Sequence, residues 1–232
     1  MTNDPLVSVI MAVRNGERFL KQGLDSVCAQ QYRNFEILVI DGNSTDGTAT
    51  IAQSYPAVRF FQQSGHGLYN AWNEGLAAAR GELIAFLDHD DLWTPNKLHL
   101  QVAHLRQQRE ARCVIAQVQF FLEPGCEIPR GFKPELFDAP QTGRISGTLL
   151  ARQDLFDEVG GFDANLKIAG DVDWFARVKD CGARMDFLPE VLLHKRIHES
   201  NLAGNAQVNN QELALLLKRS IERQRLGAGR EL

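Results

Sequence analysis

The chain has 232 residues, of which 44% are hydrophobic and 23% are charged. This composition supplies an ordinary hydrophobic core, so it excludes a collagen, a disordered chain and, with only four cysteines, a disulfide-rich scaffold. The formal net charge of −4 argues against generic nucleic-acid binding, because such binding needs a basic surface.

The first half of the chain alternates strand-like and helix-like segments. Buried strands are predicted where apolar and β-branched residues cluster, at 7–13, 35–40, 58–61 and 82–87. Helical patterns separate them. The clearest covers 68–80, and a later helix is expected to begin with Thr94 as N-cap and Pro95 as first helical residue and to end near residue 109. This alternation predicts a mostly parallel sheet with helices on both faces.

The second half is less regular. Four of the eight prolines fall within 124–140, which favours a long loop there. The other expected elements are strands at 114–122, 185–188 and 191–197, a short helix before Gly160-Gly161, a helix that begins at Asp171, and an amphipathic helix at 207–225 with Leu213, Leu215, Leu216, Leu217 and Ile221. No interdomain linker interrupts the pattern, so we expect a single domain.

Polar clusters follow three of the predicted strands, at Arg14-Asn15, Asp41–Asp46 and Asp88–Asp91. Ligands bind beyond the carboxyl ends of strands in such sheets, so the three clusters are expected to form one site. The last cluster places three carboxylates in four residues, and hard oxygen ligands suit Mg²⁺ or Mn²⁺ with substrate phosphates. Taken alone, it equally fits an acidic loop before a helix, where aspartates favour the helix dipole.

Several common catalytic motifs are missing from the sequence. It contains no G-x-x-x-x-G-K-[ST] loop for phosphates and no G-x-G-x-x-G after the first strand. It also contains no G-x-S-x-G nucleophile elbow. Hydride transfer and acyl hydrolysis therefore lack the parts that they ordinarily use.

A close resemblance to the family-2 glycosyltransferases of the GT-A type covers VSVIMAVRNGERFLKQGLDSVCAQQYRNFEILVIDGNSTDGT and GLYNAWNEGLAAARGELIAFLDHDD. It continues more weakly through 159–163, 169–174 and 196–200. The resemblance implies a single GT-A-like domain. Its expected parts are a nucleotide-sugar donor half at 7–98, an acceptor and catalytic-base half at 110–205, and a C-terminal helix at 206–226.

The resemblance implies donor-binding roles for five residues that precede the acidic cluster. Ala12 and Arg14 would lie in the first loop, which contacts the nucleotide, and Asp41 would recognise the base. Asn73 and Arg80 would help to position the sugar donor. Arg14 stands where the family commonly has tyrosine, and Gly42 stands where it often has a second acid.

The resemblance also assigns the chemical roles. Asp88 would face the ribose and Asp90 would bind the cation. Asp171 would be the catalytic base, and His198 would lie near the metal or the diphosphate. The glutamate that the family places before the base is Gly170 here. The Q-x-x-R-W motif of processive synthases is absent, so a chain-extruding synthase is not expected.

The implied reaction is a metal-dependent, inverting transfer of a sugar from a nucleotide-diphosphate sugar to a saccharide or lipid-linked acceptor, with Mn²⁺ or Mg²⁺ as cofactor. The implied setting is surface polysaccharide or glycolipid assembly. Two alternatives stay open: a nucleotidyltransferase that makes an activated sugar, and a catalytically silent nucleotide-sugar-binding protein. No apolar run reaches the roughly 20 residues of a transmembrane helix. We therefore expect a cytoplasmic protein, with peripheral membrane contact and the oligomeric state left open.

Overall fold

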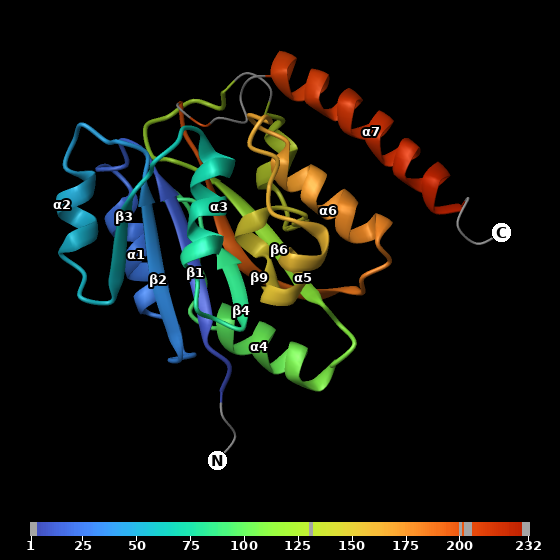
Figure 1. Cartoon of the computed structure of the whole chain (residues 1–232). Helices are drawn as coiled ribbons and strands as arrows, with labels where there is room; N and C mark the ends of the chain where they lie inside the picture. Colours follow the sequence, from blue (N-terminus) through green and yellow to red (C-terminus); the bar gives the residue numbers. More distant parts are fainter. Residues whose placement is uncertain (1–3, 130–131, 200, 202–205, 229–232) are drawn as a thin grey trace.

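Four of the predicted strands form the amino-terminal half of a single curled sheet. The computed structural model describes residues 4–129, 132–199, 201 and 206–228. It places β1 (Val7–Val13), β2 (Phe35–Asp41), β3 (Val58–Gln62) and β4 (Leu83–Phe86) in the order β3-β2-β1-β4, all parallel. β1 begins near the N-terminus at the bottom of Figure 1 and runs upward, so the carboxyl ends of these strands lie at the upper edge.

Side-chain alternation along the strands divides the core between the two faces of the sheet. Val9 and Met11 of β1 pack with α1 (Leu20–Cys28) and α4 (Lys97–Gln107) on one face. Ile10 and Ala12 pack on the other face with the remaining major helices of the domain. Those helices are α3 (Leu68–Ala78), α5 (Gln153–Val159) and α6 (Gly170–Asp180), while the short α2 (Thr48–Gln53) belongs to the first face. Both faces are therefore covered, as the alternating pattern predicted.

The second half of the sheet mixes strand directions. β8 (Leu150–Arg152) runs antiparallel to β4, and β6 (Cys113–Leu122) runs antiparallel to β8 and to the short β7 (Gln141–Thr142). β9 (Met185–Ile197) runs parallel to β6 and carries β5 (Leu92–Trp93) at its outer edge. The 3₁₀ turns η1 (Pro134–Phe137) and η2 (Ser146–Thr148) lie between β6 and β8.

Two predictions about local structure are wrong. The expected strands at 185–188 and 191–197 are one strand, since Leu188 pairs with Ala116 and Val191 with the next residue of β6. Pro189 and Glu190 are accommodated as a bulge, which tolerates the missing proline N–H.

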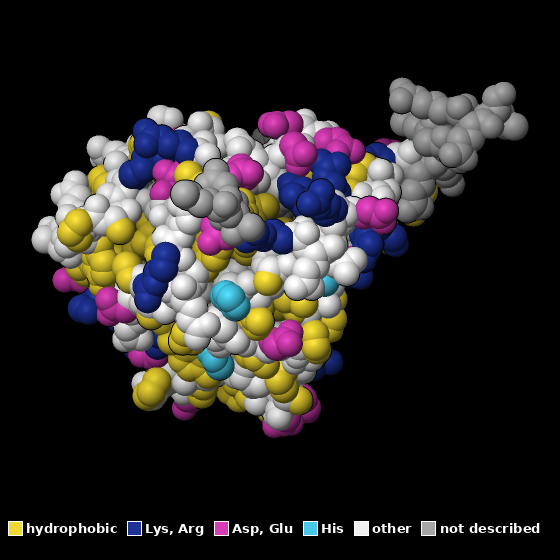
Figure 2. All heavy atoms as spheres, turned by 90° about the horizontal axis from the view of Figure 1, so that it is seen from below, with side chains coloured by type: hydrophobic (Ala, Val, Ile, Leu, Met, Phe, Trp, Pro, Cys, Tyr) yellow, Lys and Arg dark blue, Asp and Glu magenta, His cyan; other side chains and the backbone are white. Residues whose placement is uncertain are grey.

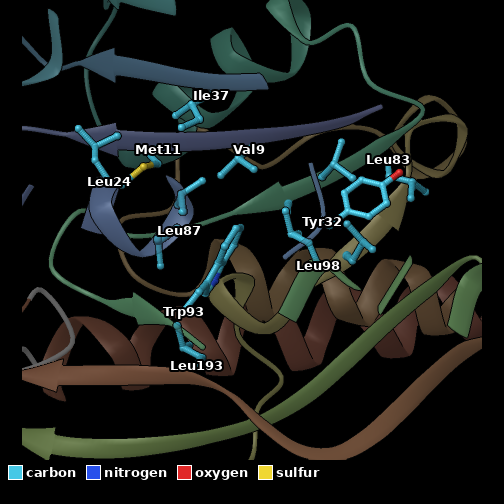
Figure 3. Packing of buried hydrophobic residues seen from close by; sticks show 14 of the residues in the cluster. Val9, Met11, Leu24, Tyr32, Ile37, Leu83, Leu87, Trp93, Leu98 and Leu193 are labelled. Atoms are coloured by element: carbon cyan, nitrogen blue, oxygen red, sulfur yellow. The ribbon is translucent and has the colours of Figure 1, made fainter. Parts of the chain in front are cut away.

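The helix expected from Pro95 begins only at Lys97, because Leu92 and Trp93 pair with β9 and Asn96 becomes the N-cap. Trp93 packs against Leu193 of β9 (Figure 3) and donates its indole N–H to the Gly147 carbonyl at 2.9 Å. This buried contact favours the short strand over a longer helix.

The C-terminal helix α7 (Ala206–Ala228) lies along the outside of α6 (Figure 1). Of the five apolar residues expected to make it amphipathic, Leu216 alone is buried, and Leu217 is 65% exposed. Of these five residues, Leu216 therefore anchors the helix to the domain, together with polar contacts that are described below. Among the described helices, none combines the length and apolarity that a bilayer crossing requires.

On the face of the molecule shown in Figure 2, basic and acidic side chains lie interspersed among hydrophobic ones. Cys28, Cys113, Cys126 and Cys181 are all free thiols. Cys113 is fully buried and Cys28 packs at the edge of the core, so both serve as small core residues.

Candidate active site at the carboxyl edge of the sheet

The three polar clusters meet at the carboxyl edge of the sheet, on either side of β1. Val13, the last residue of β1, pairs with Asp41 in β2, and Arg14 follows it. On the other side, Ile10 pairs with Phe86 of β4, two residues before Asp88. The expectation that these clusters share one edge is therefore confirmed.

Side-chain hydrogen bonds hold the first loop against the second. The Asn15 Oδ1 accepts the Thr45 N–H at 2.9 Å, and the Asn15 N–H donates to the Ser44 hydroxyl at 2.8 Å. The Gly16 N–H donates to the Thr48 hydroxyl at 2.8 Å. Asn15 has a φ of 50°, a left-handed conformation that asparagine tolerates better than most residues. The two loops therefore form one rigid wall of the site.

Asp41 lies at the bottom of this wall and is only 3% exposed. Its carboxylate accepts hydrogen bonds from the Ser44 N–H, at 3.1 Å, and from the Ser44 hydroxyl. Gly42 leaves little room for a second acid, because a Cβ there would lie 3.2 Å from the Gln63 Oε1 and 3.3 Å from the Arg14 Cβ. Gln63, at the end of β3, was not singled out from the sequence, although it follows a strand as the other clusters do.

Ala12 and Arg14 differ in their environment. The Ala12 side chain is buried in the core beneath α3, so the structure gives it a packing role below the loop. The Arg14 side chain is exposed at the edge of the site, where it is free to approach a ligand.

The acidic cluster forms the opposite wall. Carboxylate oxygens of Asp88, Asp90 and Asp91 lie within 4.8 Å of one another. Both carboxylate oxygens of Asp91 bind β9: its Oδ2 lies 2.8 Å from the Lys195 ammonium, and its Oδ1 accepts the Arg196 N–H at 2.9 Å. The two remaining aspartates, 88 and 90, are therefore the ones available to a ligand or a cation.

Lys195 is the main site residue that the sequence did not reveal. Its ammonium contacts Asp91 and lies 3.3 Å from the Asp88 Oδ2. Although burial disfavours the ammonium, the three neighbouring carboxylates raise the pKa of Lys195 well above its usual range. Nothing in the surrounding sequence marks it, since its partners lie more than 100 positions away and depend on the pairing of β5 with β9.

His198 contacts Asp90 across the chain. Its Nε2 lies 2.9 Å from the Asp90 Oδ2, and its ring packs at 4.8 Å from the Phe19 ring. Burial opposes ionisation of Asp90, but the hydrogen bond with His198 and the charge of Lys195 lower its pKa below the usual range. The imidazole therefore lies beside the carboxylate that was predicted to bind the cation.

Arg196 connects this wall to the first helix. Its Nε donates to the Asp90 carbonyl at 2.8 Å, and its guanidinium packs over Phe19 and Phe121 at 4.7 and 4.8 Å. A second nitrogen donates to the Gln22 Oε1 of α1 at 2.6 Å. These contacts fix the backbone of Asp90 and hence the direction of its carboxylate.

Asp171 lies in the first turn of α6, facing the acidic wall. Burial, together with the charge of Asp88, raises its pKa to about 6, against the opposing effect of the hydrogen bond from the Val172 N–H at 2.8 Å. Tyr69 of α3 packs beside it and donates its hydroxyl to the Ile168 carbonyl. A carboxylate with this pKa is suited to accept a proton near neutral pH.

The ring of Tyr69 explains why residue 170 is a glycine. A Cβ at Gly170 would lie 2.6 Å from two ring carbons of Tyr69, closer than real Cβ contacts come. Tyr69 therefore occupies space that a larger residue before Asp171 would need.

We expect Gly170→Ala to lower the free energy of unfolding by about 1–3 kcal/mol, because the added methyl group overpacks a buried site. Chemical denaturation measures this. The double variant Gly170→Ala/Tyr69→Leu removes the opposing ring. Its loss of unfolding free energy should be smaller than the sum of the losses in the two single variants. Simple additivity would show that the ring does not limit residue 170.

The structure contradicts the expectations for Asn73 and Arg80. Both ends of the Asn73 amide are used by the backbone of Phe162, at 2.8 Å each, so Asn73 joins α3 to the turn after α5. The Arg80 N–H bonds the side chains of Ser8 and Glu36, near the amino ends of β1 and β2. That edge is roughly 16 Å from the site at the rise of a strand. The exposed Arg80 is therefore too far away to position a donor.

A divalent cation fits the charge and chemistry of the acidic wall. Four carboxylates, those of Asp88, Asp90, Asp91 and Asp171, belong to this wall. Among the described residues, Lys195 pairs with two of them, whereas the Arg196 guanidinium pairs with Glu123 outside the cluster. The remaining negative charge and the set of oxygen donors beside one imidazole suit Mn²⁺ or Mg²⁺. Asp90 and His198 are the residues that would hold it.

The sequence is similar to those of known glycosyltransferases. A model of the family described as glycosyl transferase family 2 matches residues 8–160. An uncharacterized glycosyltransferase of Rickettsia typhi is 31% identical over 218 residues, which cover 88% of this chain and 68% of that protein.

Two solved structures share the fold at 22% identity each. TarS of S. aureus, in complex with UDP-GlcNAc, has a TM-score of 0.70 and matches 86% of this chain and 61% of its own. The mannosyltransferase PcManGT of Pyrobaculum calidifontis, in complex with GDP-Man and Mn²⁺, has a TM-score of 0.72 and matches 95% of this chain and 65% of its own. This chain therefore spans less than two thirds of either structure.

Proposed function

This chain belongs to the family 2 glycosyl transferases, and from that premise we propose that it transfers a sugar from a nucleotide-diphosphate sugar to an acceptor hydroxyl with inversion at the anomeric carbon. The observation that supports this most is that Asp171 lies close enough to Asp88 to feel its charge, and Asp88 belongs to the same acidic cluster as Asp90, which His198 contacts. A base on one side and a cation site on the other are what a direct displacement needs.

The donor would bind along the wall between the first two loops and the acidic cluster. Asp41 would accept a hydrogen bond from a ring N–H of the base, and Arg14 would contact the nucleotide. Asp88 would take the ribose hydroxyls, with Lys195 holding its carboxylate in place. When bound to Asp90 and His198, Mn²⁺ or Mg²⁺ would neutralise charge on the departing diphosphate.

Asp171 would act on the acceptor. Its carboxylate takes the proton of the acceptor hydroxyl while the acceptor oxygen bonds to the anomeric carbon. The bond from that carbon to the diphosphate oxygen breaks on the opposite face, and the nucleoside diphosphate leaves. Asp173, two residues along, is not available for this role, because its carboxylate is buried and lies 2.8 Å from the Arg177 Nε.

The partners of this reaction follow from the family and from neighbouring structures. TarS and PcManGT were solved with UDP-GlcNAc and GDP-Man, so we propose uracil or guanine nucleotides as the donor class. We further propose that the acceptor is a saccharide or a lipid-linked molecule, and that the reaction belongs to surface polysaccharide or glycolipid assembly. Residues 124–140 lie beyond the donor half and are proposed to contact the acceptor; of these, 130–131 lie outside the described residues. Peripheral contact with the cytoplasmic face of a membrane would bring a lipid-linked acceptor to this loop.

A thermal-shift panel tests the proposal. UDP, GDP, UDP-GlcNAc and GDP-mannose are each added with Mn²⁺ and with EDTA, since only a ligand that binds the folded state raises the melting temperature. We expect at least one nucleotide to stabilise the protein, and to do so more strongly with Mn²⁺. UTP or GTP with a sugar phosphate is added as a separate arm; stabilisation in that arm and by none of the four other ligands would favour a nucleotidyltransferase instead.

We expect His198→Ala to weaken binding of the nucleoside diphosphate by about 1–3 kcal/mol, the cost of losing a hydrogen bond to a charged group. Binding of the free nucleoside should hardly change, because it has no phosphates. Calorimetric titration of UDP and uridine, or of GDP and guanosine, separates the two. Equal losses for both ligands would show that the packing of His198 against Phe19 supports the fold and not the phosphates.

The pKa of Asp171, which burial raises to about 6, predicts the acidic limb of the pH profile. The base form dominates above that pKa, so turnover should be constant above pH 7 and should fall as the pH drops through about 6. Donor and Mn²⁺ are kept saturating at each pH, and binding of nucleoside diphosphate is measured in parallel. A turnover number that stays constant down to pH 5 would contradict the role of Asp171.

A further inference from the structure

The C-terminal helix α7 docks on the domain through one polar face. Arg219 pairs with Asp163 at 2.9 Å, and Arg223 pairs with Asp180 of α6 at 2.8 Å. Leu216, on the same face, is buried against the core beneath α6. These contacts fix the register of α7 and bring one further residue of this face, Glu212, to the segment that precedes α6.

Glu212 binds three successive backbone N–H groups. Its Oε1 accepts the Lys167 N–H at 2.7 Å, and its Oε2 accepts those of Ile168 and Ala169 at 3.0 and 2.9 Å. Although burial acts against ionisation, these three hydrogen bonds lower the pKa of Glu212, so the carboxylate form is the one that the backbone selects.

The segment that Glu212 binds leads directly to Asp171. Ala169 is the N-cap of α6 and its side chain makes no capping hydrogen bond. Within the first turn Asp171 accepts the Val172 N–H, but no local side chain accepts the N–H of Ala169 or of the two residues before it, which donate to Glu212 instead. Glu212 supplies a carboxylate at this end of the helix, where the helix dipole also favours negative charge.

A second residue holds the same segment from the opposite side. The Tyr69 hydroxyl of α3 donates to the Ile168 carbonyl, so Ile168 is bound through its carbonyl by α3 and through its N–H by α7. With both contacts in place, the backbone that presents Asp171 has little freedom to rotate or shift.

We propose that Glu212 is a positioning residue, which sets the direction of the catalytic base Asp171 by binding the backbone of residues 167–169 from the C-terminal helix. This inference rests on the proposed function, because it needs Asp171 to be the base. It gives α7 a role in turnover that does not require α7 to touch either substrate. It also places a determinant of catalysis 41 residues after Asp171 in the sequence, outside residues 8–160, which the family model matches.

Glu212→Gln tests this. Glutamine has the size of glutamate, but it has one acceptor oxygen in place of two, so it cannot accept all three N–H groups as the carboxylate does. We expect turnover with UDP-GlcNAc or GDP-mannose, measured as release of nucleoside diphosphate with Mn²⁺, to fall about ten- to a hundredfold, as small displacements of a reacting group can cause. The Kd of UDP or GDP with Mn²⁺ should stay within about twofold, since the donor wall is untouched. Glu222→Gln, the same change at an exposed position of α7, is the matched control and should behave as the unmodified chain.

Two further measurements keep the result interpretable. Glu212→Asp keeps the carboxylate on a shorter side chain and should recover part of the lost turnover, whereas loss of folding would affect Kd and melting temperature in both variants. Unchanged turnover in Glu212→Gln, alongside a loss in Asp171→Asn, would overturn the role of Glu212 and leave the proposed function standing. Unchanged turnover in Asp171→Asn would instead remove the premise.

Discussion

Asp171→Asn is expected to lower turnover by about a hundredfold or more, while nucleoside diphosphate affinity stays within a few-fold. Asparagine has the size of aspartate and can still accept the Val172 N–H that Asp171 holds at 2.8 Å. It cannot take a proton from an acceptor hydroxyl. Steady-state kinetics with saturating donor and Mn²⁺ measure the loss, and calorimetric titration measures the affinity.

Asp157→Asn, at an exposed position of α5, is the matched control for this substitution. Asp173→Asn is a second comparison, because removing its charge should break the buried pair with Arg177 and reduce stability instead of chemistry alone. Turnover of Asp171→Asn within a factor of about three would exclude Asp171 as the base, since a general base contributes far more.

Asp90→Ala is expected to abolish the dependence of nucleotide binding on Mn²⁺ while the protein remains folded. Asp90 follows β4 at the edge of the sheet, and its backbone is held separately through the Arg196 side chain at 2.8 Å. Removing the carboxylate breaks its 2.9 Å contact with His198 and takes away the oxygen ligand that we propose for the cation. Titration of UDP or GDP with Mn²⁺ and with EDTA measures the effect.

The free nucleoside controls for damage to the donor wall, because its binding should not respond to Asp90→Ala. An Mn²⁺-dependent affinity for the diphosphate that equals that of the unmodified chain would overturn the assignment of Asp90. A weaker affinity in both Mn²⁺ and EDTA would point to a role of Asp90 in nucleotide binding without the metal.

The local sequence pattern was sufficient to predict most of the strands in the donor half, residues 7–98. Continuous β-branched runs such as 7–13 and 35–40 can be buried on both faces only in a covered parallel sheet, so their strand assignment and their shared edge followed from composition and order. For the same reason the placement of Asp41, Asp88 and Asp90 at that edge was predictable, because each follows a strand directly. The role of each residue came from the resemblance to the family and stays a prediction.

Contacts between distant segments were the part that local pattern could not predict. Lys195 compensates the acidic cluster only because β5 pairs with β9, and its partners Asp88 and Asp91 lie more than 100 positions away in the sequence. Asn73 and Arg80 were misplaced because one helix, α3, spans from the carboxyl edge to the amino edge of the sheet. Asn73, about one and a half turns into that helix, binds Phe162, and Arg80, beyond the end of the helix, lies near the amino edge, although both residues stand between two site motifs in the sequence.

The most direct test of the central claim is the release of nucleoside diphosphate from a panel of UDP- and GDP-sugars by the unmodified chain, with Mn²⁺ or Mg²⁺ and with EDTA. We expect that at least one donor releases UDP or GDP, that EDTA abolishes the release, and that Asp90→Ala and Asp171→Asn each reduce it by about a hundredfold or more. Release that continues at the same rate with EDTA and in both variants would contradict the account.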